Sequence, residues 1–461
     1  MEQLNQEIEL FTNRLNAVIE TTVPKYTPVN SMSRYVDTNI RKLKEKKKYL
    51  LNLKRHNQPV EFNLDHLINQ INYKIKKAFS INCNKYWSNH AKEIDYTDTS
   101  TFHKSIKRQF IHKPYKEIST LHIDKKNDHI IDKLCWNKNE IMQDNEKFII
   151  SKKKDVLDVM TLYYEHINTI KNLDKNSRFT KIVQKAAKEL DTKNTEFQLN
   201  NNTITTFTEQ NPAFKPTINT ENLFTNTDSL MKILKIFPNK SSTGPDNIPN
   251  VVLKNLNRKE IKNLAVIFNN ATNNLYFPAK WKTAKLICLK KKDKPLNDPA
   301  SFRPISLLSN VGKLYEKTIT IPIKNYCRVK KLIPNEQFGF RDKHSTVYAI
   351  SKLTTDICDA LNNNEKVGAC LIDIEKCFDS VWTDGVIYKL IQKKFPEKLI
   401  LLVNNMIRGR TFYVSDGDTM SRITGKVENG LQQGTISSPL LFIITNSDIL
   451  HLYGLNNSEM N

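Results

Sequence analysis

Hydrophobic residues recur at helical spacing in the first part of the chain. Leu4, Ile8, Phe11, Leu15 and Val18 share one face of a helix, which predicts an amphipathic helix that ends before Pro24. Similar patterns predict helices with apolar faces at Ile40 to Leu50, Leu64 to Tyr86, Val156 to Tyr163 and Leu230 to Phe237. Residues 97–150 lack a regular period, and residues 191–220, rich in Thr and Asn, are typical of a linker.

A different pattern begins at Val367. The short apolar run to Ile374 lies between asparagines and charged residues, which predicts a buried strand that ends near Asp373. A buried carboxylate needs a partner, so Asp373 is a candidate ligand of a divalent metal ion. Aspartates near strand ends often simply cap the next helix, and Phe378 would by default be a core aromatic.

Glycine divides the chain into two parts. All 11 glycines lie at Gly244 or later, and 461 residues exceed the usual size of one domain. A glycine-free segment lacks the residue that tight turns most often use, so we expect mainly helices and extended connectors up to residue 243. We expect the chemistry to lie after that point.

The charge favours a polyanionic partner. The net charge is +23, of which residues 1–200 carry +11, so both halves are basic. The predicted helix over residues 41–55 carries eight basic residues against Glu45, and residues 102–116 alternate basic and aromatic side chains. Both segments could contact nucleic acid, the first through phosphates and the second through stacked bases. Solvated surfaces that keep the chain soluble would give the same composition.

The cysteines and the N-terminus bear on the compartment. The seven cysteines are irregularly spaced, without a CxxC pair or a histidine cluster, which argues for reduced thiols and against zinc. Neither a signal peptide nor a run of about 18 apolar residues is present. We therefore expect a nuclear or cytoplasmic protein that is not secreted and has no membrane partner.

Several polar motifs follow Gly244. Residues 240–249 contain the turn sequence Gly-Pro-Asp-Asn, and residues 281–294 form an apolar strand that ends in lysines. The four lysines of this run and Arg303 could hold a triphosphate, although an exposed basic hairpin is an equal alternative. Further on, Gln433 lies in a glycine-bracketed loop before an apolar helix, where glycines would let the backbone approach a flat ligand.

Together and in this order, these segments resemble the reverse transcriptase of jockey-like non-LTR retrotransposons. The resemblance rests on STGPDNIPNVVLKNL, ICLKKKDKPLNDPASFRPISLLSNVGKLYEK, LIPNEQFGFRDKHST, LIDIEKCFDSVWTDGVIYKL and GLQQGTISSPLLF. It implies an α+β fold in which residues 222–461 form right-hand polymerase fingers and a partial palm. Residues 1–221 resemble, more loosely, the basic and mainly α-helical connector that precedes the polymerase in such elements.

The resemblance also implies roles for individual residues. Asp373 matches the first metal-binding aspartate, with the main-chain carbonyl of Ile374 as a further ligand. Phe378 matches the aromatic gate that favours deoxynucleotides, Arg303 and Lys291 the triphosphate-binding residues, and Gln433 the glutamine beside the incoming nucleotide. The implied activity is DNA synthesis on an RNA template, with a DNA primer, dNTPs and two Mg²⁺ ions.

Two departures from the family pattern matter. Gln432 replaces the usual proline before Gln433, and proline would fix φ at that position. The sequence also stops at Asn461, before the Asp-Asp hairpin that supplies the other metal ligands, and contains no Asp-Asp pair. We therefore expect a C-terminally truncated polymerase that is inactive or nearly so. The alternatives are a non-catalytic nucleic-acid-binding relic and an RNA-templated RNA polymerase, which Phe378 opposes.

Overall fold

The computed structural model describes residues 1–22, 36–55, 63–93, 118–124, 128–134, 142–143, 147–169, 173–200, 223–239, 242–374 and 376–449. The chain divides into two compact units, one of Val23–Lys116 and one of Met1–Thr22 with Glu117–Asn461. The boundary predicted at residues 221 and 222 lies outside the described residues and stays a prediction. The same holds for the basic and aromatic segment at residues 102–116.

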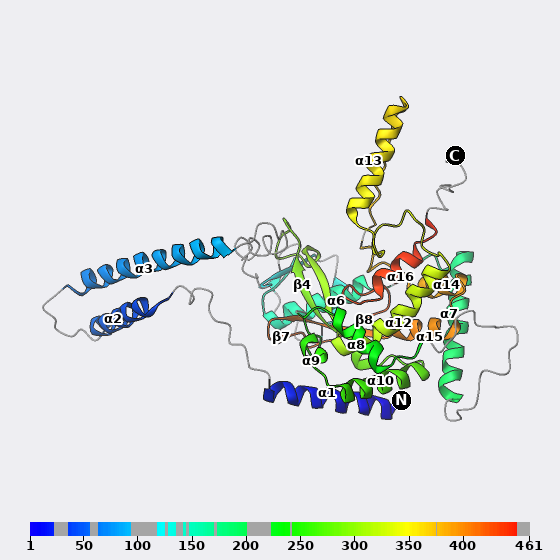
Figure 1. Ribbon diagram of the computed structural model, residues 1–461, viewed down its shortest axis with the longest axis horizontal. Helices are drawn as coiled ribbons and strands as arrows, with labels where there is room; N and C mark the ends of the chain where they lie inside the picture. Colours follow the sequence, from blue (N-terminus) through cyan, green and yellow to red (C-terminus); the bar gives the residue numbers. More distant parts are fainter. Residues whose placement is uncertain are drawn as a thin grey trace. The chain divides into compact units, whose positions relative to one another are not determined.

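The unit Val23–Lys116 contains two helices, α2 (Thr38–Arg55) and α3 (Leu64–Glu93) (Figure 1). The two helices pack through a small core of Leu50, Ile68 and Ile71. The sequence predicts both helices and the apolar side of α2 correctly, because burial follows the helical period. Most of the lysines of α2 are exposed to solvent, whereas Ile40 is fully buried.

A five-stranded sheet lies at the centre of the larger unit. Its strands are β4 (Thr283–Lys290), β5 (Phe302–Leu307), β6 (Arg410–Asp416), β7 (Thr419–Met420) and β8 (Gly425–Val427). The order is β5-β4-β6-β7, with β8 also paired to β6. β4 and β6 are parallel and the other pairs are antiparallel, so this parallel pair joins segments more than a hundred residues apart.

The larger unit also contains helices, most of which lie around this sheet (Figure 1). In chain order they are α1 (Glu2–Thr22), α5 (Asp128–Asp132), α6 (Lys153–Ile167), α7 (Arg178–Asn200), α8 (Thr227–Ile236), α9 (Asn250–Lys254), α10 (Arg258–Asn273), α11 (Ala279–Lys282), the 3-10 helix η5 (Pro299–Ser301), α12 (Asn310–Val329), α13 (Thr346–Asn362), α14 (Thr383–Gln392), α15 (Glu397–Ile407) and α16 (Ser438–Thr445). Helices and a mainly antiparallel sheet thus occupy different stretches of the chain, which is an α+β arrangement. Among the described residues, no helix is both long and apolar enough to span a membrane.

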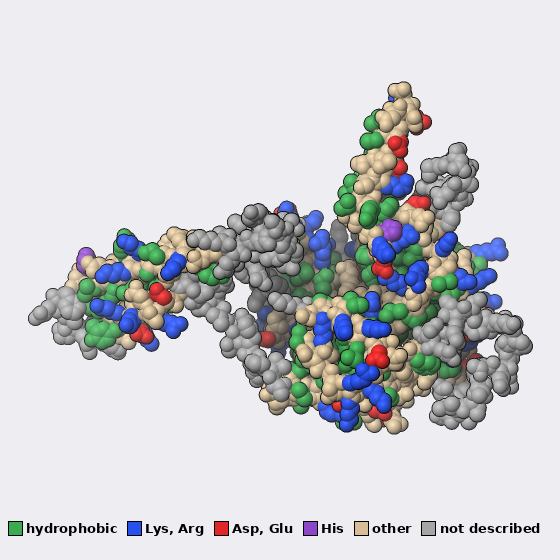
Figure 2. All heavy atoms as spheres, viewed as in Figure 1, with side chains coloured by type: hydrophobic (Ala, Val, Ile, Leu, Met, Phe, Trp, Pro, Cys, Tyr) green, Lys and Arg blue, Asp and Glu red, His purple; other side chains and the backbone are tan. Residues whose placement is uncertain are grey.

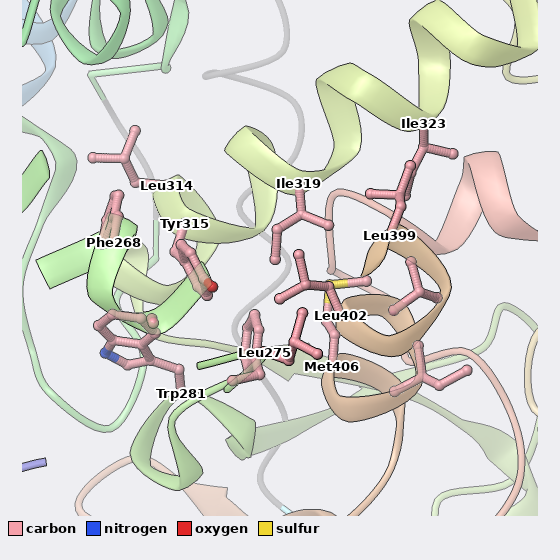
Figure 3. Close-up of a cluster of buried hydrophobic side chains, with 14 of the residues drawn as sticks. Phe268, Leu275, Trp281, Leu314, Tyr315, Ile319, Ile323, Leu399, Leu402 and Met406 are labelled. Carbon is pink, nitrogen blue, oxygen red and sulfur yellow. The ribbon is translucent and has the colours of Figure 1, made fainter. Parts of the chain in front are cut away.

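Among its described residues, the larger unit has two hydrophobic cores, and the larger of these lies between the helices. Phe268, Trp281 and Tyr315 meet at its centre, with ring centroids 5.1–5.8 Å apart, and Ile319 and Leu402 continue the cluster (Figure 3). The hydroxyl of Tyr315 lies 3.2 Å from that of Thr272, so the buried polar atom has a hydrogen-bond partner. This core contains side chains of α12 and α15, and both helices contact Ser437 in the loop from Gly430 to Ser437.

The second core lies between one face of the sheet and α6. Its members include Leu286, Phe412 and Val414 from the strands and Val156 and Met160 from α6. The alternation of buried side chains along β4 and β6 reflects the period of two of a strand. The sequence predicts α6 correctly at Val156 to Tyr163.

Two expectations about the glycine-free half are wrong. Residues 97–150, expected to be irregular, include a three-stranded antiparallel sheet of β1 (Leu121–Asp124), β2 (Met142–Gln143) and β3 (Lys147–Ile150). Its strands have two to four residues, too few to show an alternating pattern. Residues 191–200, expected to start a linker, complete α7, whose Asp191 accepts a hydrogen bond from Asn404 Nδ2 at 2.8 Å. Threonine and asparagine content therefore does not exclude a packed helix.

The prediction of a buried strand at Val367 to Ile374 is also wrong. This segment forms no strand, Leu371 is 94 % exposed and Ile372 is 74 % exposed. The preceding helix α13 has no buried residue and stands apart from the sheet (Figure 1). Residue type favours a strand here, but a strand also needs a neighbour for its hydrogen bonds, and none of the described residues pairs with this segment.

Candidate functional site

The loop from Gly430 to Ser437 is held between two other segments. The N–H groups of Gly430 and Leu431 donate to the carbonyls of Val381 and Phe378 at 2.9 and 2.8 Å. On the other side, the Ser306 N–H in β5 donates to the Gln433 carbonyl at 3.1 Å. The loop therefore joins the turn after residue 376 to the sheet.

The two glycines of this loop allow these close approaches. Gly430 has φ +92°, and a Cβ there would lie 2.8 Å from the Asp379 carbonyl oxygen. Gly434 has φ +111°, and a Cβ there would lie 2.4 Å from the Ser306 carbonyl oxygen. The sequence predicts that these glycines admit a flat ligand. In the structure they admit the protein's own backbone.

Asp379 is the carboxylate that faces this loop. It is half-buried, its side chain hydrogen-bonds that of Gln433, and it lies in the field of Lys376 and Lys291. Burial raises the pKa of Asp379 above its usual value, and the Gln433 hydrogen bond and the two lysines oppose that rise. A small pocket between β5 and the loop is lined by Pro304, Ser306, Asp379 and Gln433, among others.

Sequence reasoning missed Asp379. The sequence does contain a signal for Asp379, because this second aspartate lies six residues after Asp373 and directly follows Phe378. Periodicity does not distinguish the two acids, since only the fold shows which of them faces Gln433.

Phe378 lies beside the same loop. The ring is half-buried between Phe442 and Phe340, with centroids 5.1 and 5.7 Å away. Its carbonyl accepts from Leu431, so ring and loop are tied by adjacent contacts. These two aromatic neighbours restrict the rotamer of Phe378. A side chain that shapes a binding site needs such support from its neighbours.

The two predicted phosphate-binding residues differ in position. Lys291 is half-buried after β4, its Nζ donates to the Ala300 carbonyl at 2.7 Å, and it lies in the field of Asp379. Arg303 is exposed on β5. Successive side chains of a strand alternate in direction, so Arg303 lies on the face opposite Pro304 and Ser306, which line the pocket. The structure thus groups Lys291 with Gln433 and Phe378, and leaves Arg303 on the other face.

The predicted metal ligands lie outside this group. Asp373 is exposed in the segment without secondary structure, and Ile374 is 46 % exposed beside a second pocket with Trp382 and Phe442. Among the described residues, no three acidic, histidine or cysteine side chains gather in a way that could hold a metal ion. Two adjacent cations need several carboxylates, so the described residues do not by themselves fit a two-ion site.

The visible surface of the larger unit is rich in cations. Figure 2 shows Lys and Arg side chains in several groups across it, with fewer Asp and Glu side chains. Lys290, Lys292 and Lys294 at the tip of the β4–β5 hairpin are all exposed. These cations adjoin the half-buried Lys291, so the hairpin presents positive charge near the loop.

Comparisons with known proteins identify similar chains. Residues 289–457 match the family described as reverse transcriptase (RNA-dependent DNA polymerase). A Drosophila melanogaster protein described as a probable RNA-directed DNA polymerase from transposon BS is 35 % identical over 222 residues, 48 % of this chain and 24 % of that protein. The RNA-directed DNA polymerase from mobile element jockey of the same species is 33 % identical over 222 residues, with the same coverage of each chain. The chain thus spans about a quarter of the length of these relatives.

Proposed function

Since residues 289–457 form a reverse transcriptase domain of the jockey-like non-LTR retrotransposon kind, we propose that the chain is part of an RNA-directed DNA polymerase. Such an enzyme extends a DNA primer on an RNA template with dNTPs. The observation that carries this proposal is the convergence of Phe378, Gln433 and Lys291 around Asp379 within the matched segment. We assign the β4–β5 hairpin to the fingers, and β6 with α14 and α16 to the palm.

In this proposal each grouped residue has a role at the nucleotide. Lys291 uses one of its three N–H donors on Ala300, which leaves two for phosphate oxygens. Phe378, held by its two aromatic neighbours, excludes a ribose 2′-hydroxyl. Gln433 contacts the incoming nucleotide, and Asp379 orients its amide. Arg303 binds the triphosphate only if the nucleotide reaches the exposed face of β5.

Reverse transcriptases use a divalent cation, and we propose Mg²⁺. Asp373 and the Ile374 carbonyl are the proposed ligands in this chain. Because no three acidic, histidine or cysteine side chains gather among the described residues, we assign no reaction step to these two groups.

Selection of the templated nucleotide tests the proposal. A mobility-shift assay would measure how each dNTP, with Mg²⁺, changes the lifetime of the chain's complex with an RNA template and a DNA primer. We expect the dNTP that pairs with the next template base to prolong the lifetime, and Gln433→Ala to remove that effect. Lys280→Ala is the control, because Lys280 pairs with Glu9 at 2.9 Å on the outer surface.

Equal lifetimes with all four dNTPs would contradict the polymerase proposal. Retained, salt-sensitive binding without nucleotide selection would instead favour the non-catalytic nucleic-acid-binding alternative.

A further inference from the structure

Two buried charges lie under the loop from Gly430 to Ser437. Arg410, the first residue of β6, is 5 % exposed, and Glu316 of α12 is 2 % exposed. They are close enough for the charge of Glu316 to stabilise the Arg410 cation. Burying two ions is costly unless each makes specific hydrogen bonds. The hydrogen-bond partners of Arg410 and Glu316 therefore show which part of the loop each residue fixes.

Arg410 holds the start of the loop. Its Nε donates to the Met406 carbonyl at 2.7 Å, and its Nη1 donates to Gln432 Oε1 at 2.8 Å. The Gln432 side chain is itself buried. The residue before Gln433 is therefore fixed through its side chain, by a cation that is anchored at the end of α15.

Glu316 holds the end of the loop. Its Oε1 accepts from the Ser437 N–H at 3.1 Å and from the Ser437 hydroxyl. Between the two ends, the Thr435 hydroxyl donates to the Gln432 carbonyl at 3.3 Å. Hydrogen bonds to Arg410 and Glu316 thus fix both ends of the turn from Gln432 to Ser437, and one hydrogen bond within the turn links Thr435 to Gln432.

We propose that Arg410 and Glu316 are positioning residues, which set the loop so that Gln433 faces Asp379. Neither touches the pocket, so each acts through the loop, Arg410 through Gln432 and Glu316 through Ser437. This inference rests on the proposed function for its consequence at the nucleotide, but its structural part can be measured without nucleic acid.

Proline at position 432 offers a rescue. Among the described residues, no hydrogen bond from the Gln432 N–H is present, so proline there removes no backbone bond. Proline fixes φ without a side-chain partner and would replace the constraint that Arg410 supplies.

Hydrogen exchange of the 461-residue chain, followed by mass spectrometry, tests the positioning. We expect the amides of residues 430–438 to exchange at least tenfold faster than in the wild type in each of Gln432→Ala, Glu316→Gln and Arg410→Met. The double variant Arg410→Met/Gln432→Pro should recover most of the protection from exchange. Arg408→Met is the control. Arg408 lies two residues away and bonds Asp384 and Asn404, so its loss should leave the loop unchanged.

Exchange in Gln432→Ala that equals the wild type would overturn the inference, and this variant decides the question if Arg410→Met does not fold. A second readout separates positioning from plain stability. Gln432→Ala should shorten the lifetime gained from the templated dNTP at least fivefold, whereas Arg408→Met should not. A loosened loop in a chain that never selects nucleotides would overturn the proposed function and leave the positioning intact.

Discussion

At the scale of the residue, Asp379 gives a pH-dependent signature. Its pKa is raised in the folded chain, mainly by burial, so the folded state binds more protons than the unfolded state between the two pKa values. Stability contributed by this group is therefore greatest below its unfolded pKa and falls as pH rises through its folded pKa. We expect Asp379→Asn to raise the free energy of unfolding at pH 7 and to change little at pH 3.5.

Urea unfolding at the two pH values measures this difference. Asp418→Asn, at an exposed carboxyl in the turn after β6, is the control and should have no effect at either pH. A decrease in stability at pH 7 would mean that the Gln433 hydrogen bond and the lysines outweigh the burial of Asp379.

Phe378 gives a second prediction at this scale. Truncation to Ala leaves space between Phe340 and Phe442, so a ribose 2′-hydroxyl would no longer meet the ring. We expect Phe378→Ala to reduce the preference for the templated dNTP over the matching rNTP at least tenfold, measured as complex lifetime. Phe340→Ala removes a neighbouring ring and should change this preference less. An unchanged preference in Phe378→Ala would exclude the gate.

At the scale of the element, the loop depends on Gly434. A methyl group there meets the Ser306 carbonyl, and φ of +111° is strained for alanine. We expect Gly434→Ala to lower the free energy of unfolding by ~2–3 kcal/mol. Gly368→Ala, where an added Cβ meets nothing within 4 Å, should change it by less than about 0.5 kcal/mol. Chemical denaturation of both variants checks the pair, and equal losses would mean that the loop is free to move.

Helix α6 is tied to the sheet by Arg422. Its Nε and its backbone N–H both donate to the fully buried Asp158 at 2.7 Å, and its guanidinium also pairs with Asp155. Arg422 itself is 44 % exposed, so we expect Arg422→Met to cost about 2–3 kcal/mol, because the buried carboxylate of Asp158 loses the hydrogen bond from its cation. Arg258→Met breaks the exposed pair with Asp228 and should cost less than about 1 kcal/mol. Thermal unfolding of the two variants distinguishes these outcomes.

The elements also show what sequence patterns can predict. α1, α2, α3, α6 and α8 follow from apolar periodicity, because a helix makes its own backbone hydrogen bonds and needs a neighbour only for one face. The segment ending at Asp373 could not be placed in this way, since a strand depends on a distant partner. For the same reason, the sequence indicated Gln433, Phe378 and Lys291 separately but not Asp379, which links them, nor Arg410 and Glu316 beneath the loop.

At the scale of the whole molecule, nucleic-acid binding and catalysis would depend on different features of the chain. The net charge of +23 is spread over both halves of the chain, so the proposed binding of nucleic acid would depend on no single residue. Catalysis is different, because two cations must be held by several carboxylates at once. Asp373 is exposed, and the described residues place no group of metal-binding side chains beside it.

We therefore expect the 461-residue chain to bind an RNA–DNA hybrid but to extend its primer only at background level. A poly(rA)/oligo(dT) extension assay with Mg²⁺ and dTTP measures synthesis, and fluorescence anisotropy of the labelled hybrid measures binding in the same buffer. Asp373→Asn should not weaken binding, because it removes an exposed anion and no cation from the surface. Robust dTTP incorporation that is lost in Asp373→Asn would contradict this expectation, and would mean that carboxylates of this chain assemble around Asp373 when the hybrid binds.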